Sequence, residues 1–412
     1  MTTIADGGAP ADVRAGADSV FAYLERTAEP VRAGVRWRTL SYQNTPEYAP
    51  GLWDGTAGIA LFLADYERLT ADGRGAHLAR AALAWSTGAA PTEIDSDEGY
   101  AASLGWGWSG IGLAWLRLAA VTGRDAPRAA AAVMGERVLA AGPGPRVSLL
   151  QGAAGRGAFL VRLWAATGDG RFLAGAVACA EALRTRLLPI ACGGAWPPEL
   201  ASAKGPAADV PLGYAGGLAG VGHFFARVAA HTGDATWHKA ARDIATLLAA
   251  SAHPERGGIN WPPALGAGPT RLPDLGHPRC QWCIGGAGIG LFYAAASELL
   301  ADAKWREMAV AAGQATYAYG DGRGNPGYCH GLAGNAQLFI ELHRLTGEAV
   351  WSERAQEFAG RALAYRRSGP EGESWPADEP GLIAPNFSTG AAGVGHCFLR
   401  VLDPSAVPVA LP

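Results

Sequence analysis

Two kinds of apolar segment alternate along the chain. One kind is almost wholly apolar and follows a glycine turn, as in "GIALFLADYERL" (58–69) and "GIGLFYAAASELL" (288–300). The other carries apolar residues at i, i+3, i+4 and i+7 with charges on the opposite face, as in 76–90, 236–252 and 350–367. This period predicts amphipathic helices, and strand-like alternation is nearly absent. The pattern therefore predicts helix pairs in which an inner helix is buried and an outer helix faces solvent.

A Gly-x-Ala/Ser-Gly run opens each apolar segment and occurs seven times. The first glycines of the seven repeats are Gly55, Gly107, Gly152, Gly217, Gly285, Gly331 and Gly390. A period of this size is typical of repeat architectures, and glycine at a helix start permits tight turns and close packing. Neither the first nor the last copy looks like the polar cap of an open array. The sequence therefore predicts an all-α fold, an α/α toroid (barrel) of seven inner and seven outer helices.

We expect one domain, residues 1–412, with repeats over about 51–402 and a flexible tail over 1–12. The chain has 412 residues, 49% hydrophobic and 17% charged, which indicates a globular protein with a large core. Its net charge of -3 argues against nucleic-acid binding. No apolar run could span a membrane, and the N-terminus does not resemble a signal peptide. Six cysteines are too few for a disulfide framework in so long a chain. These features predict a cytoplasmic protein.

Candidate metal ligands occupy equivalent positions in two neighbouring repeats. Cys283 and Cys329 each stand two residues before a first glycine, and His330 directly follows Cys329. If all inner helices start on one face, these residues meet at one point. Two thiolates and one imidazole suit Zn²⁺, and three protein ligands leave the fourth position open, as in catalytic zinc sites. Cys280, in "CQWC", could supply a fourth ligand and close the site; it has no counterpart in the next repeat, so we leave it out.

The seven glycine-rich helix pairs, with "WCIG" in the fifth copy and "YCHG" in the sixth, resemble the lanthionine synthetase C-like (LanC-like) family. The resemblance covers nearly the whole chain. It implies an α/α toroid that binds one zinc ion through Cys283, Cys329 and His330. It also implies an enzyme of lanthipeptide biosynthesis, in which a peptide cysteine adds to dehydroalanine or dehydrobutyrine to form a thioether ring. The expected partners are a dehydrated precursor peptide and a separate dehydratase.

The resemblance also bears on proton transfer and on charge stabilisation. An arginine precedes the first zinc cysteine by four residues in the family, and Arg279 holds that position; a cation there suits a developing enolate. The family's usual histidine and aspartate are replaced by Gly216 and Ser148. His277 is our candidate for the missing acid–base group. Weaker candidates are Tyr214, Tyr328, Asp54, His223 and His396.

Two other functions compete with a zinc-dependent cyclase. A degenerate family member could bind a peptide or a partner enzyme without catalysis; the replaced acid–base residues favour this, and the intact ligand triad opposes it. A prenyltransferase-like or terpene-cyclase-like toroid is disfavoured, because no Asp-Asp-x-x-Asp run is present and seven copies exceed the six of those rings. The sequence therefore favours an enzyme that forms carbon–sulfur bonds.

Overall fold

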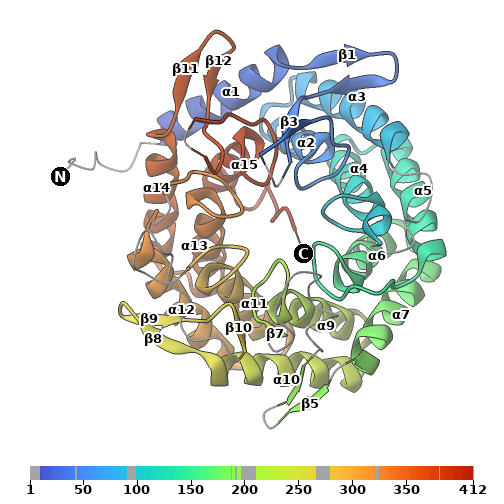
Figure 1. Cartoon of the computed structure of the whole chain (residues 1–412), viewed down its shortest axis with the longest axis vertical. Helices are drawn as coiled ribbons and strands as arrows, with labels where there is room; N and C mark the ends of the chain where they lie inside the picture. The colour runs from blue at the N-terminus through green and yellow to red at the C-terminus, as the bar shows by residue number, and fades with distance from the viewer. Residues whose placement is uncertain are drawn as a thin grey trace. The chain divides into compact units, whose positions relative to one another are not determined.

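A computed structural model describes most of the chain, which falls into two compact units (Figure 1). The first unit contains residues up to 90, 110–131 and 320–411, and the second contains 91–109 and 132–319. The described residues are 10–41, 44–90, 99–186, 188–190, 193–195, 210–265, 279–321, 324–379 and 381–411.

The described residues contain α-helices of the two predicted kinds. The inner helices each begin directly after the first glycine of a repeat: α2 (Thr56–Thr70), α4 (Trp108–Thr122), α6 (Ala153–Thr167), α9 (Leu218–Thr232), α11 (Gly286–Leu299), α13 (Leu332–Thr346) and α15 (Ala391–Leu402). The outer helices are α1 (Pro10–Arg26), α3 (Arg74–Ala89), α5 (Asp125–Ala141), α7 (Gly170–Arg186), α10 (Ala235–Ser251), α12 (Ala303–Tyr319) and α14 (Ala349–Leu363). The predicted all-α class is thus confirmed.

Inner and outer helices pack in pairs within each unit. In the second unit α6 packs on α7, α9 on α10 and α11 on α12. In the first unit α2 packs on α3, α13 on α14, and α15 on α1, so the last inner helix has the first helix of the chain as its partner (Figure 1). Helix α1 begins at Pro10, which corrects the predicted tail over 1–12: its last three residues are helical.

The second glycine of the run leaves no room for a side chain in the repeats of Gly58, Gly155, Gly220, Gly288 and Gly393. At Gly288 a Cβ atom would lie 1.9 Å from the carbonyl oxygen of Trp282 and 2.6 Å from the Cβ of Tyr214 in the preceding repeat. Contacts this short are excluded by atomic radii. The predicted role of these glycines in turns and close helix packing is therefore confirmed.

Short hairpins follow four of the outer helices, and the sequence pattern did not predict them. The antiparallel pairs are β1 (Glu29–Val31) with β2 (Gly34–Arg36), β3 (Thr39–Leu40) with β4 (Pro46–Glu47), β5 (Leu188–Ile190) with β6 (Gly193–Ala195), β7 (Val210–Pro211) with β10 (Ala264–Leu265), β8 (His253–Glu255) with β9 (Gly258–Asn260), and β11 (Arg367–Gly369) with β12 (Gly372–Ser374). One 3₁₀ turn, η1, covers Tyr100–Ala102.

A tryptophan fixes three of these hairpins to the helix that precedes them. The indole Nε1–H groups of Trp37, Trp261 and Trp375 each donate to a main-chain carbonyl near the end of α1, α10 or α14, at 2.8, 2.6 and 2.9 Å. In all three cases the acceptor lies 13 residues earlier in the chain. The buried indoles therefore set where the chain leaves each hairpin and turns toward the next inner helix.

Buried charges also occur on the inner helices, which the sequence had indicated to be almost wholly apolar. In the first unit Arg117 lies 2.6 Å from Asp65, and Arg400 lies 2.6 Å from Glu341. Both arginines also donate to main-chain carbonyls of residues 407–409. The two ion pairs thus hold the C-terminal segment, because buried carbonyl groups require donors.

Two further observations bear on the chain's environment. Within the described ranges, no helix combines the length and the apolar character needed to cross a membrane. The five cysteines in these ranges form no disulfide.

Candidate metal centre

Main-chain hydrogen bonds connect the segments that precede neighbouring inner helices. We call the residue two places before each first glycine the loop residue of its repeat. In the second unit, Gly105 N–H donates to Leu150 O, Leu150 N–H to Ala215 O, and Ala215 N–H to Cys283 O, at 2.8, 3.1 and 3.3 Å. The loop residues of repeats two to five therefore follow one another in register, and Cys283 ends this series.

The first unit repeats this arrangement around Cys329. Cys329 N–H donates to Ser388 O at 2.7 Å, and Ser388 N–H donates to Trp53 O at 2.9 Å. The loop residues of repeats six, seven and one thus stand in order, as the equivalence of the seven repeats predicts. Cys283 and Cys329 have the same place within their repeats, and both are buried.

A buried asparagine fixes the segment that carries Cys283. The Asn260 side chain, at the end of β9, donates through Nδ2 to Arg279 O at 2.9 Å and accepts from Gly286 N–H at 2.8 Å. Gly285 between them has φ +100°, a conformation that favours glycine. Both ends of the Cys283 segment are therefore fixed.

Asp378 orients the imidazole of His330. Its Oδ2 lies 2.7 Å from His330 Nδ1, and Asn325 Nδ2 donates to its Oδ1. Because a carboxylate accepts, Nδ1 carries the proton, and the lone pair of Nε2 points away from Asp378. That Nε2 atom lies 3.3 Å from the sulfur of Cys329. Metal-binding histidines have this arrangement, in which a carboxylate fixes the tautomer and leaves the other nitrogen for the metal.

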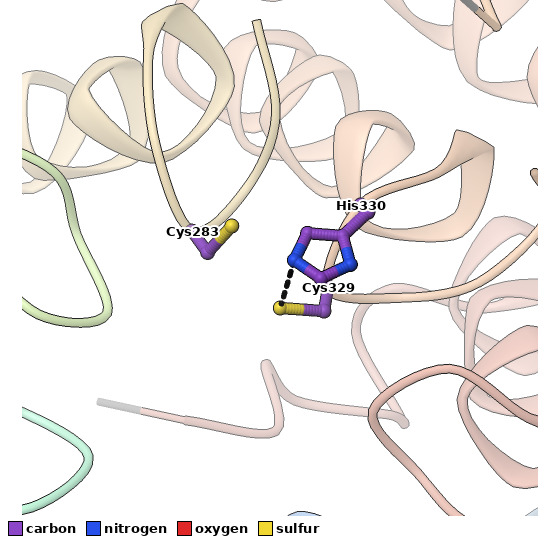
Figure 2. A group of neighbouring side chains, drawn as sticks. All are labelled: Cys283, Cys329 and His330. Carbon is purple, nitrogen blue, oxygen red and sulfur yellow. Dashed lines mark hydrogen bonds between the residues drawn. The ribbon is translucent and has the colours of Figure 1, made fainter. Parts of the chain in front are cut away.

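The structure brings the three predicted ligands together. The ligand atoms of Cys283, Cys329 and His330 all lie within 4.8 Å of one another, and Figure 2 shows the contact between Cys329 and His330. This group could hold a metal ion. Cys280 is not a member: burial raises the pKa of its thiol to about 11, and its sulfur lies 3.4 Å from Thr316 Oγ1.

Of the two predicted catalytic residues, only Arg279 is among the described residues. Arg279 is described and half-buried; its main chain is held by Asn260, and its Nε is a buried atom with no hydrogen-bond partner among the described residues. His277 lies outside the described residues.

The two substituted family positions have different surroundings. Gly216 is exposed, and a Cβ atom there would meet no atom within 4 Å. Ser148 is buried, and its hydroxyl accepts from Gln151 N–H at 3.3 Å within a turn. Neither residue offers an acid or a base with an ordinary pKa near neutrality.

The histidine candidates are buried and already bonded. His223 Nδ1 lies 2.6 Å from Tyr214 Oη, and burial together with nearby arginines holds the pKa of His223 well below its usual value. His396 Nδ1 lies 3.0 Å from Asp65, and burial lowers the pKa of His396 to about 4. Both imidazoles belong to the packed interior of the inner helices.

Comparison with known proteins identifies the family. The model described as "Lanthionine synthetase C-like protein" matches residues 46–411. The chain therefore belongs to the lanthionine synthetase C-like family, as the sequence predicted. It is 35% identical over 101 residues to LanC-like protein GCL1 of Arabidopsis thaliana, and 30% identical over 100 residues to Glutathione S-transferase LANCL1 of Danio rerio. These matches cover 22% and 24% of this chain and 23% and 25% of the relatives, about a quarter of each.

Solved structures confirm the predicted toroid. Nisin cyclase is similar with a TM-score of 0.64 and 17% identity, over 94% of this chain and 93% of the cyclase. A sugar epimerase from a ruminal bacterium is similar with a TM-score of 0.52 and 12% identity, over 97% and 100% of the two chains. At these identities the likeness shows the fold alone, and the fold shared with nisin cyclase is the α/α toroid.

Proposed function

We propose that the protein is a zinc-dependent enzyme that forms thioethers, adding a cysteine thiol of a peptide to dehydroalanine or dehydrobutyrine. The observation that carries this proposal is the cluster of Cys283, Cys329 and His330, with ligand atoms within 4.8 Å of one another. Membership of the lanthionine synthetase C-like family and the fold of nisin cyclase support it.

The donor atoms fit Zn²⁺ better than a hard cation. Two thiols and one imidazole nitrogen are ligands that Zn²⁺ prefers, whereas Mg²⁺ and Ca²⁺ prefer oxygen. The proton on His330 Nδ1 is directed at Asp378, so Nε2 is available as the third ligand atom. Bound by these three residues, zinc would keep one open position and lower the pKa of a thiol that occupies it.

We assign Arg279 to the acceptor side of the reaction. Addition of sulfur to the β-carbon places negative charge on the carbonyl oxygen of the dehydroamino acid. A cation near that oxygen stabilises the developing enolate. Arg279 stands four residues before Cys283, its main chain is fixed by Asn260, and its Nε has no partner among the described residues. His277, two residues before Arg279 in the sequence, is the sequence-based candidate for proton transfer, and an alternative pair is argued below.

The proposed substrate is a ribosomally made peptide that a separate dehydratase has modified, and the proposed compartment is the cytoplasm. The similarity to nisin cyclase supports a peptide substrate. The relative from Danio rerio is named a glutathione S-transferase, so a small thiol is a second candidate nucleophile.

The test uses the purified protein with a synthetic peptide that carries one dehydroalanine and one cysteine. Mass spectrometry after alkylation of free thiols separates the cyclised product from the linear peptide, and a sample without protein gives the spontaneous rate. We expect cyclisation well above that rate, loss of it in Cys329→Ala, and retention in Cys280→Ala. A second sample, in which glutathione is added to a dehydroalanine peptide without cysteine, distinguishes the two thiols.

Binding without catalysis is the alternative, and the residues Gly216 and Ser148 favour it. It predicts that the protein binds the peptide but leaves both reactions at the spontaneous rate. That result, with zinc present in the protein, would refute the proposed enzyme.

A further inference from the structure

Asp54 and Ser388 occupy the positions of the metal ligands in the two repeats that follow Cys329 along its hydrogen-bond series. Ser388 is the loop residue of repeat seven, as Cys329 is of repeat six. Asp54 directly precedes a first glycine, as His330 does. The main-chain bonds from Cys329 to Ser388 and from Ser388 to Trp53 place all these residues side by side in the first unit.

The two side chains form a buried pair. Ser388 Oγ donates to Asp54 Oδ1 at 2.5 Å. Ser388 is 2% exposed and Asp54 is 4% exposed, close to the 5% of Cys329. Since a carboxylate only accepts, the hydroxyl proton of Ser388 is directed at Asp54, and the lone pairs of Oγ are directed elsewhere. Such a hydroxyl can take a proton from a neighbour while it passes its own proton to the carboxylate.

We propose that Asp54, acting through Ser388, carries the proton in thioether formation and so replaces the family's usual acid–base residues. This inference rests on the function proposed above. As the carbon–sulfur bond forms and the carbon–carbon π bond breaks, the thiol proton passes to Ser388 Oγ and the hydroxyl proton passes to Asp54. The carboxyl group then returns a proton through Ser388 to the α-carbon of the enolate, and the thiol has added across the double bond with no other reagent.

Position distinguishes this pair from the histidine candidates. His223 and His396 lie six residues after a first glycine, about 9 Å along the inner helix from its start. His223 is bonded to Tyr214, and His396 to Asp65. Asp54 and Ser388 instead belong to the same row of residues as Cys329 and His330.

The experiment measures the rate and the stereochemistry of cyclisation of the dehydroalanine–cysteine peptide by zinc-loaded protein. The parent is compared with Asp54→Asn, Ser388→Ala and the matched control Ser374→Ala, a buried serine on β12 of the same unit. Chiral chromatography of the hydrolysed product gives the ratio of α-carbon epimers, which reports the face from which the enolate is protonated. Zinc content and melting temperature show whether each variant is intact.

We expect Asp54→Asn and Ser388→Ala to keep their zinc and to lose about 10²-fold or more in rate. The epimer ratio of their residual product should move toward that of the spontaneous reaction, which a merely structural role would not cause. Ser374→Ala should match the parent.

Either of two results overturns the inference: rates within about threefold of the parent, or a reduced rate with the parent's epimer ratio. If Asp54→Asn does not fold, Ser388→Ala decides alone. A parent that forms no product overturns the proposed function itself, and this inference with it. A productive parent whose two variants behave like it overturns only the role of Asp54 and Ser388.

Discussion

The contact between Asp378 and His330 makes a quantitative prediction about metal affinity. The substitution Asp378→Asn keeps the size of the side chain but removes its charge. Its amide group must also face either His330 Nδ1–H or the Asn325 amide, both of which donate to the carboxylate in the parent. At least one of these hydrogen bonds is therefore lost, and the imidazole is no longer fixed in the tautomer that leaves Nε2 for the metal.

Loss of such a carboxylate partner typically weakens metal binding by about 10–100-fold, which corresponds to about 1.4–2.7 kcal/mol. We therefore expect the zinc dissociation constant of Asp378→Asn to rise by that factor. Competition with a chromophoric chelator at neutral pH measures it without reference to activity. Glu379→Gln is the matched control, because Glu379 is the exposed carboxylate of the next residue. A dissociation constant within about twofold of the parent, against the factor expected, would refute the orienting role of Asp378.

Three further predictions concern the zinc ligands, the pH dependence of stability, and Gly216 in repeat four. Cys283→Ala should abolish zinc binding, whereas Cys280→Ala should leave the zinc content measured by mass spectrometry unchanged; the reverse would contradict the ligand assignment. Burial lowers the pKa of His396 from 6.5 to about 4, so an unfolded chain binds more protons than the folded protein between these values. The free energy of unfolding of the zinc-free protein, measured with urea, should therefore fall by roughly 3 kcal/mol at most as the pH drops through this range. An equally steep fall in zinc-free His396→Gln would contradict the assignment of this pH dependence to His396. Because Gly216 is exposed with open space at its Cβ, Gly216→His in the Asp54→Asn background should recover part of the lost cyclisation rate. If the double variant is soluble and binds zinc but is no faster, loss of proton transfer is not the reason that Asp54→Asn is slow.

The sequence was sufficient to predict the repeats, because their cause is local. Each first glycine directly precedes an inner helix, and in five repeats a Cβ on the second glycine would strike a carbonyl oxygen of the preceding turn, as at Gly288. Because these contacts are local, the repeat period can be read from the sequence. The same equivalence of positions predicted that Cys283, Cys329 and His330 would meet.

Asp378 was missed because it contacts His330 across 48 residues of chain, and no spacing rule joins the two. A signal was nevertheless present. Trp37, Trp261 and Trp375 mark a second repeat, the hairpin whose indole bonds back to the outer helix 13 residues earlier. Asp378 stands three residues after its tryptophan, where the other two copies have apolar residues. Alignment of the three hairpins would have shown that the third copy alone has a carboxylate at this position.

The buried ion pairs were also beyond the sequence pattern. Asp65, Arg117, Glu341 and Arg400 all lie ten residues after a first glycine, within segments whose apolar neighbours dominate the period. Their pairing requires different inner helices and the C-terminal segment to come together. Only tertiary structure supplies that information, because a charge in an apolar segment does not indicate its partner.

X-ray absorption at the zinc edge of the purified protein shows whether a zinc ion is held by three protein ligands with one position open. We expect about one zinc per chain, with two sulfur ligands at ~2.3 Å and one histidine nitrogen at ~2.0 Å. Addition of a thiol substrate should raise the sulfur number by one. A third protein sulfur before any thiol is added, or a site without sulfur, would contradict this ligand set.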